Sequence, residues 1–296
     1  MSRAHPVVAV TGSSGAGTST VKAAFEHIFR RLDVTASIIE GDSFHRYDRA
    51  EMKEAIVQAG KRGENISHFG PEANLLCDLA SLFKEYGETG RGKRRYYVHN
   101  EDEALLHGCP SGTFTPWEDL SADTNMLLYE GLHGAMVTDE CDVSQFADLL
   151  IGVVPIVNLE WIQKIHRDTQ DRGYKEGDVT STILRRMEDY VTHITPQFSR
   201  TDINFQRVPT VDTSNPFIAR DVPTADESFV VIRFRDPTKY DVDFPYLLAM
   251  INNSFISRRN TIVVPGGKML LAMELILMPI LKRMVEESAS GTRLVA

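Results

Sequence analysis

The opening stretch, residues 6–32, constrains the fold more than any other part of the chain, because three patterns follow one another there. Residues 6–11 form a short β-branched run that suits a buried parallel strand. A glycine-rich turn, residues 12–17, follows this run. Apolar residues then recur at helical spacing, at Val21, Phe25, Ile28, Phe29 and Leu32. Strand, glycine turn and helix in this order are the opening of a βαβ unit.

Further apolar runs predict a sheet of several strands. The predicted strands cover residues 36–40, 126–129, 149–154, 229–234 and 261–264. A helix is predicted near residues 159–169, and the polar region from about 50 to 120 is expected to mix short helices with long loops. Strands that alternate with helices imply an α/β fold with a mixed, mostly parallel sheet and helices on both faces. We expect one domain over residues 1–296, with a packed C-terminal helix at 269–281.

Charge and cysteine content narrow the class of partner and the compartment. A net charge of −9 argues against nucleic acid as a partner, since binding a phosphate backbone usually needs a basic face. Cys77, Cys109 and Cys141 are odd in number and lack CxxC spacing, which predicts reduced thiols in a cytoplasmic protein. The N-terminal apolar run is too short to span a bilayer and leaves no room for a signal peptide, so we expect no membrane attachment.

The glycine-rich turn has the pattern of a phosphate-binding loop. It reads Gly12-Ser13-Ser14-Gly15-Ala16-Gly17-Thr18-Ser19. The pattern G-x-x-x-x-G-K-[ST] is matched at both outer glycines and at Ser19, whose hydroxyl would reach Mg²⁺. Backbone N–H groups and the positive end of the following helix would hold phosphate oxygens. Thr18 stands where lysine is expected, so in a phosphate-binding loop the missing positive charge must come from elsewhere in the chain. The alternative interpretation of residues 12–17 is a tight turn without function.

A basic helical segment is a candidate source of that charge. Lys164, Asp168 and Arg172 fall at i, i+4 and i+8 and therefore share one helix face, with Arg167 adjacent. Gly173 would let the segment hinge, so residues of about 160–175 are expected to form a lid over the phosphates. The alternative is a solvated helix with an ordinary i,i+4 ion pair.

Two acids follow predicted strands, where ligands bind in parallel sheets. Asp42 follows the second strand and Glu130 the third, so either could accept a hydroxyl proton or stand beside Mg²⁺. The alternative is a pair of capping or loop acids. A short basic cluster soon after Asp42, formed by His45, Arg46 and Arg49, could hold a substrate phosphate. A second basic stretch, residues 91–99, includes His99 and is otherwise typical of a solvated loop.

Longer motifs resemble a known family, the bacterial phosphoribulokinases of the Calvin cycle, over essentially the whole chain. They are VTGSSGAGTST (10–20), IEGDSFHR (39–46), LLYEGLHG (127–134), VNLEWIQKIHRD (157–168), TDINFQRVPTVDTSNPF (201–217) and PTADES (223–228). Threonine in place of the loop lysine is a feature of that bacterial group. The resemblance implies a P-loop kinase-like α/β fold that uses Mg²⁺-ATP to convert ribulose 5-phosphate into ribulose 1,5-bisphosphate.

The resemblance also implies residue roles. Asp42 would be the general base, and Glu130 and Asp168 the other catalytic acids close to Mg²⁺. Lys164 and Arg167 would neutralise charge on the moving phosphoryl group. The implied contacts to ribulose 5-phosphate are His45, Arg49, Arg172 and, more weakly, His99.

The resemblance also implies regulation, with the choice between the adjacent Arg258 and Arg259 left open. Bacterial members form homo-oligomers and are activated allosterically by NADH, for which the candidate contacts are Arg31, Arg186, Arg233 and Arg258. Chloroplast relatives are switched by a cysteine within the glycine loop, where this chain has Ala16. Thiol switching by that route is therefore not expected.

Three alternative functions compete with this interpretation. Uridine and pantothenate kinases of the same fold keep the loop lysine, whereas this chain has Thr18. A GTP-binding switch protein would need an Asn-Lys-x-Asp motif, which the sequence lacks. A regulator that only binds nucleotide would not need Asp42, Glu130 and Asp168 together.

Overall fold

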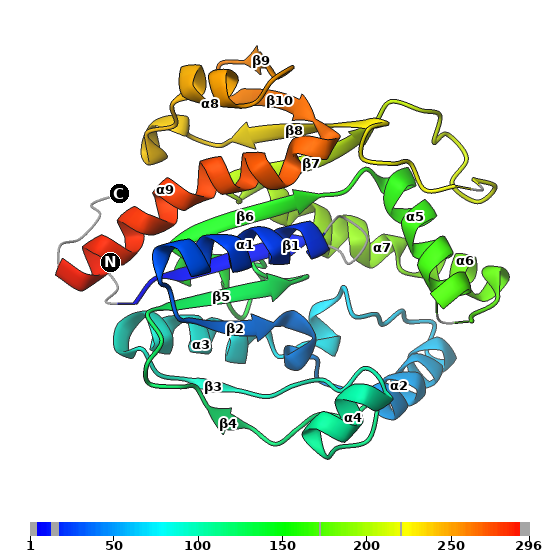
Figure 1. The fold of residues 1–296 in the computed structure, drawn as a ribbon. Coiled ribbons are helices and arrows are strands. Elements are labelled where there is room, and N and C mark those ends of the chain that lie inside the picture. Colours follow the sequence, from blue (N-terminus) through cyan, green and yellow to red (C-terminus); the bar gives the residue numbers. More distant parts are fainter. Residues whose placement is uncertain (1–4, 13–17, 172, 220, 291–296) are drawn as a thin grey trace.

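The computed structural model describes residues 5–12, 18–171, 173–219 and 221–290, and an eight-stranded sheet crosses them (Figure 1). In spatial order the strands are β2 (Ala36–Glu40), β5 (Met126–Gly131), β1 (Val7–Gly12), β6 (Leu149–Val154), β7 (Ile203–Pro209), β8 (Ser228–Phe234), β10 (Thr261–Pro265) and β9 (Phe255–Arg258). Neighbours from β2 to β7 pair in parallel, and those from β7 to β9 pair antiparallel. The predicted mixed, mostly parallel sheet is confirmed.

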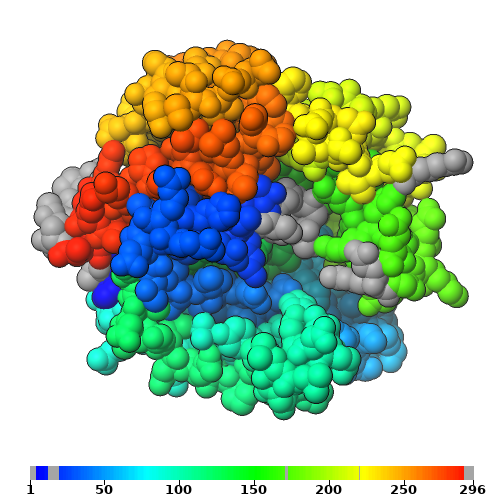
Figure 2. Space-filling view, in the orientation of Figure 1, coloured from blue at the N-terminus to red at the C-terminus, as the bar shows by residue number. Residues whose placement is uncertain are grey.

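Both faces of the sheet are covered, as the alternation along β1 shows. Val8 and Val10 face the core formed with α1 (Thr18–Leu32) and α9 (Met269–Ser290), whereas Val7 and Ala9 face the core under α3 (Leu76–Thr89). All four β1 side chains are buried, since a strand with helices on both sides has no solvated face. In Figure 1, α1 and α9 lie across the near face of the sheet, and Figure 2 shows both helices at the near surface of the molecule.

Helix α9 includes the segment predicted as a packed C-terminal helix and continues beyond it to Ser290. Leu277 and Leu281 are fully buried on either side of Pro279, so packing holds the helix together where the proline removes a backbone donor. Within the described part of the chain, no helix combines the length and apolarity needed to cross a membrane.

The polar region of about residues 50–120 contains the helices α2 (Arg49–Lys61), α3 and α4 (Glu101–His107). It also contains a hairpin that the sequence analysis missed, in which β3 (Lys93–Arg94) pairs antiparallel with β4 (Glu118–Asp119). The bridge between Tyr97 and Phe114 continues this pairing toward the active edge of the sheet.

The segment predicted as a lid is helical but irregular. Helix α5 (Val157–His166) runs into a π-helical stretch, Arg167–Asp171, and the short helices α6 (Glu176–Arg185) and α7 (Met187–Asp189) follow. Gly173 lies between them with φ of +69°, a conformation that suits glycine. The catalytic role predicted for this segment stays a prediction.

The expectation of three reduced cysteines is wrong for two of them. Cys77 at the start of α3 forms a disulfide with Cys141, and their Cα atoms are 5.5 Å apart. The residues are 64 positions apart in sequence, and the packing of α3 against the segment around residues 144–146 brings them together. Spacing along the chain carries no information about such a pair. Cys109 is a free thiol.

Candidate active site

The site is built at the carboxyl ends of β2 and β5, which pair in parallel with Glu40 opposite Glu130. A Cβ added at Gly131 would lie 2.6 Å from the Cα of Gly41, so these strand ends approach too closely for larger residues. Asp42 follows directly in a short 3₁₀ helix, Gly41–Phe44. The two glycines therefore place Asp42 beside Glu130, as the sequence predicted from equivalent strand ends.

Two histidines hold the carboxylate of Asp42. His45 Nε2 lies 3.2 Å from one oxygen and His99 Nε2 lies 3.6 Å from the other. Burial opposes ionisation of Asp42, but the hydrogen bond and positive charge of His45, then His99, outweigh it and hold the pKa of Asp42 well below its usual range. The lowered pKa keeps the carboxylate ionised at neutral pH, and the side chain is accessible because it is 43% exposed.

The orientation of His45 is set by Asn74. The Asn74 amide donates to the carbonyls of His68 and Gly70, which leaves its Oδ1 to accept from His45 Nδ1 at 2.8 Å. Asn74 therefore holds the His45 ring with Nε2 directed at the Asp42 carboxylate.

Glu130 differs from Asp42 in its electrostatics. Burial is the main cause that raises its pKa to about 7, and the negative charges of Asp42 and Glu40 raise it further. Lys22 acts in the opposite direction. Lys22 lies on α1, one helical turn beyond Thr18. It is a further cation on the helix that follows the phosphate loop, in addition to the predicted Lys164 and Arg167, and it was not predicted from the sequence. Its i+4 relation to Thr18 was the available signal.

Changing Glu130 to glutamine is expected to stabilise the Mg²⁺-free protein at pH 8. Because the folded pKa of about 7 exceeds the reference value of 4.5, Glu130 contributes stability at low pH that is lost as pH rises through 7. A shift of this size corresponds to at most about 3 kcal/mol. Urea unfolding at pH 8 and pH 4 measures the change, with the exposed Glu88→Gln as control. Equal stability of wild type and Glu130→Gln at pH 8 would contradict the raised pKa.

The predicted substrate residues His45, Arg49 and His99 meet around Asp42. Arg49 donates from Nη2 to the carbonyl of His99 at 2.8 Å and from Nη1 to Ser111 Oγ at 3.2 Å. The ring of Tyr97 lies 4.9 Å from that of His99 and 6.4 Å from that of His45. The hairpin that carries Tyr97 and His99 is therefore part of the site, not a solvated loop. Arg172 lies outside the described residues.

The lid residues form a compact charged cluster. Asp168 is bound by the ammonium of Lys164 and, at 3.2 Å, by Nε of Arg167. Burial lowers the pKa of Lys164 although Asp168 acts in the opposite direction. The i,i+4 pairing considered in the sequence analysis is present, but in a buried setting instead of a solvated one: the Asp168 side chain is 6% exposed.

Arg186, predicted as an allosteric contact, lies near this cluster instead of on the open surface. Its guanidinium carbon is 5.8 Å from the centre of the Phe69 ring. Burial, followed by the charge of Arg185, lowers the pKa of Arg186 to about 10, and Asp168 opposes that shift. Arg31 is exposed at the end of α1. Arg233 and Arg258 are exposed and share Thr261 as their cross-strand neighbour, so the structure brings together only this pair of the predicted set.

Part of the phosphate loop lies outside the described residues: Ser13, Ser14, Gly15, Ala16 and Gly17. Gly12 ends β1, and a Cβ there would lie 2.8 Å from the carbonyl oxygen of Val153 on β6. Helix α1 begins at Thr18 and includes Ser19, as predicted. The N-terminus of α1 is therefore at the edge of the sheet that carries Asp42 and Glu130, where its dipole favours anions.

The donor set near Glu130 fits Mg²⁺ held jointly with a nucleotide. No group of three His, Cys, Asp or Glu side chains arranged for a metal occurs among the described residues. Mg²⁺ usually needs just one or two carboxylates, because phosphates and waters supply its other ligands. Glu130 fits that role, because it is buried beside two other carboxylates and a bound cation would favour its ionised form. Asp168 is already bound by two cations, so its predicted Mg²⁺ contact would require the lid to rearrange.

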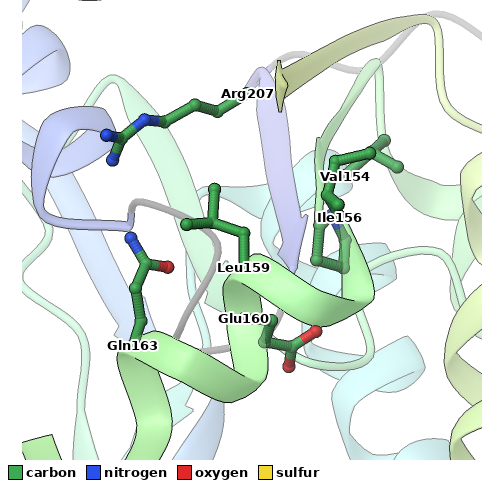
Figure 3. A pocket seen from close by; sticks show the side chains of 7 residues that line it. Val154, Ile156, Leu159, Glu160, Gln163 and Arg207 are labelled. Carbon is green, nitrogen blue, oxygen red and sulfur yellow. The ribbon is translucent and has the colours of Figure 1, made fainter. Parts of the chain in front are cut away.

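Two hollows border the site without including its acids. One, of about 10 Å³, lies between α5 and β7 and could hold about one water molecule. Figure 3 shows Gln163 and Arg207 with their polar ends on the same side of Leu159. Gln163 Oε1 is buried without a hydrogen-bond partner in the described structure. The other hollow, of about 840 Å³, lies between α3 and the β3–β4 hairpin.

A mostly parallel sheet with acids at neighbouring strand ends, and a helix that starts just after the first strand, is the arrangement of a P-loop kinase. The family model of the Phosphoribulokinase / Uridine kinase family matches residues 7–214, and the chain belongs to this family. Membership of a kinase family implies ATP as the phosphate donor.

Named relatives cover nearly the whole chain. The chain is 59% identical over 287 residues to the phosphoribulokinase of Nitrobacter vulgaris, covering 97% of this chain and 98% of that protein. It is 62% identical over 287 residues to that of Xanthobacter flavus, with the same coverage. The solved structure of phosphoribulokinase from Rhodobacter spheroides superposes with a TM-score of 0.88 at 57% identity, covering 96% of this chain and 99% of that chain.

Proposed function

We propose that this chain transfers the γ-phosphate of ATP to ribulose 5-phosphate and forms ribulose 1,5-bisphosphate. The observation that carries the proposal is the Asp42 carboxylate, held between His45 and His99 at the sheet edge beside Glu130. Full-length relatives named phosphoribulokinase support the choice of acceptor.

In the proposed reaction Asp42 orients the sugar hydroxyl and accepts its proton. The low pKa of Asp42 makes it a weak base, which suffices because phosphoryl transfer through a loose transition state demands little proton removal before the bond forms. Lys164 and Arg167 neutralise charge on the transferring group once the lid closes and releases them from Asp168. Mg²⁺, when bound beside Glu130 and Ser19, would screen the phosphate charges.

The substrate phosphate would be held by Arg49 and His45, with His99 and Arg172 completing the site. We further propose a cytoplasmic homo-oligomer activated by NADH, with Arg233 and Arg258 as the best-placed effector contacts because they are exposed in one row of the sheet. Arg186 is more easily explained as a support for the lid, since it lies near Asp168.

ADP release tests the proposal directly. The purified protein is mixed with Mg²⁺-ATP and, separately, ribulose 5-phosphate, uridine or pantothenate, each with and without NADH. Of the three acceptors, we expect only ribulose 5-phosphate to give rapid ADP release, and we expect NADH to increase that rate. Turnover with uridine or pantothenate instead would replace the substrate, and ATP binding without any turnover would favour the regulatory alternative.

Replacing Arg49 with alanine is expected to raise KM for ribulose 5-phosphate about 10- to 100-fold with a smaller change in kcat. Loss of charge-assisted hydrogen bonds to a phosphate costs about 1.5–3 kcal/mol, and a ground-state contact of this kind acts mainly on KM. Steady-state kinetics at saturating ATP measure the effect. Arg62→Ala, on the exposed end of the same helix, is the matched control. An unaltered KM would remove Arg49 from the substrate site.

A further inference from the structure

The Arg95 side chain links the β3–β4 hairpin to the short turn that carries Asp42. It donates from Nε to the carbonyl of Ser43 at 2.8 Å and from Nη2 to the carbonyl of His45 at 2.6 Å. Ser43 and His45 are both buried. One guanidinium therefore binds two backbone carbonyls, those of Ser43 and His45, just after Asp42 in the chain.

Aromatic rings fix the plane of that guanidinium. Its central carbon lies 3.7 Å from the centre of the Phe114 ring and 4.8 Å from that of Trp117. Trp117 in turn meets Phe44 edge to face, with ring centres 5.5 Å apart. Burial lowers the pKa of Arg95, with Asp78 and Glu51 opposing the shift, yet a guanidinium stays charged. Planar stacking and a double hydrogen bond are properties of arginine that lysine does not reproduce.

The held segment needs outside support. It is a single 3₁₀ turn of four residues, Gly41–Phe44, and such turns have poor internal hydrogen-bond geometry. Asp42 acts on a substrate hydroxyl, and a displacement of about 1 Å at a reacting group can cost on the order of 100-fold in rate. The contacts at Ser43 and His45 lie on the carboxyl side of Asp42, and β2 holds the chain on the other side.

We propose that Arg95 is a positioning residue for the phosphoryl transfer: it holds Asp42 and His45 in their productive geometry from the hairpin, without touching substrate. This inference rests on the proposed function, in which Asp42 is the base. It also gives the β3–β4 hairpin a second role at the active edge of the sheet, since the same hairpin carries His99 to Asp42.

The test compares Arg95→Met and Arg95→Lys with Arg94→Met. Arg94 is the neighbouring arginine and pairs with Glu118 across the hairpin at 2.9 Å, so it matches Arg95 in type and location but not in contact with the turn. We expect kcat to fall about 100-fold in Arg95→Met and about 10-fold in Arg95→Lys. KM for ATP should stay within twofold in both, and Arg94→Met should keep kcat within twofold.

Two further measurements separate positioning from a purely structural role. Ethylguanidinium should raise the kcat of Arg95→Ala at least tenfold, because it replaces the missing guanidinium. The imidazole NMR resonances of His45, assigned with His45→Gln, should shift in Arg95→Met and stay in place in Arg94→Met. The NMR measurement needs no turnover. It therefore still tests whether Arg95 holds His45 if the wild type is inactive with ribulose 5-phosphate and the proposed function fails.

The inference is overturned by a folded Arg95→Met protein that keeps wild-type kcat. It is also overturned if the His45 resonances are unmoved, if ethylguanidinium gives no rescue, or if Arg94→Met loses as much kcat as Arg95→Met. A loss of melting temperature with kcat per folded molecule unchanged would assign Arg95 to fold stability alone.

Discussion

Replacing Asp42 with asparagine is expected to lower kcat for ribulose 5-phosphate by about 10³- to 10⁴-fold. A positioned general base contributes up to about 10⁴ to the rate, and asparagine keeps the shape of the side chain but has no negative charge to accept a proton. His45 and His99 also lose the ion that they surround. Binding of ATP should change by less than twofold, because the proposed role of Asp42 is at the acceptor hydroxyl and not at the nucleotide. Initial-rate kinetics and calorimetric titration with ATP measure the two quantities.

Asp139→Asn changes an exposed acid outside the helices and strands, so it serves as the control and should keep full activity. The stability of Asp42→Asn must be compared as well, because the lowered pKa of Asp42 means that the ionised carboxylate stabilises the fold above its unfolded pKa of about 3.8. This stabilisation is lost as pH falls through the folded pKa and is small for a side chain that is 43% exposed. Unchanged turnover of Asp42→Asn would exclude Asp42 as the base.

Replacing Lys164 with methionine is expected to lower kcat by about 10²- to 10³-fold. Removing one charged or dipolar donor that stabilises a transition state costs about that much. Methionine preserves most of the apolar stem, so packing of α5 is largely kept. Asp168 loses one of its two cations, so a fall in melting temperature is also expected. Single-turnover kinetics measure the chemical step, and thermal unfolding measures the stability.

If Lys164 supplies the charge that the phosphate loop lacks at Thr18, the kcat values of two variants should differ in a way that a loss of stability does not explain. Thr18→Ala should lower kcat less than Lys164→Met does, because threonine brings no cation to the phosphates. Lys282→Met is the matched control for an i,i+4 pair, since Lys282 and Glu286 are both exposed on α9. The opposite order, with Thr18→Ala the more damaging, would mean that the phosphate loop does not depend on Lys164 for its missing charge.

The fold was largely predictable because its centre is a parallel sheet. Strands buried on both faces have to be continuous apolar runs, and β2 and β6 occupy the residues predicted for them. Strand β7 was missed, because Asn204, Gln206 and Arg207 interrupt its apolar pattern. The hairpin strands β3 and β4 were missed for a related reason: two charged residues each give no periodicity to detect.

The site was predictable where residues follow strands and unpredictable where they come from loops. Asp42 and Glu130 were found together because carboxyl ends of parallel strands meet at one edge. The contacts of Arg95 and the ring contacts of Tyr97 were hidden in a basic stretch that resembles a solvated loop. The disulfide between Cys77 and Cys141 was likewise hidden, since the pair depends on the packing of α3.

The amino-acid sequence by itself determined the α/β class, the phosphate-loop pattern with Thr18 in place of lysine, and the acids at the strand ends, because each is a local pattern with a fixed spacing. Tertiary structure alone decided the protonation of the acids and the supports around them. Glu130 has a raised pKa because the fold buries it beside Asp42 and Glu40, and Asp42 a lowered one because His45, three residues further on, and His99, from the β3–β4 hairpin, both reach it. Charges separated in sequence shift each other's pKa only when folding brings them within a few ångströms, where water no longer screens them.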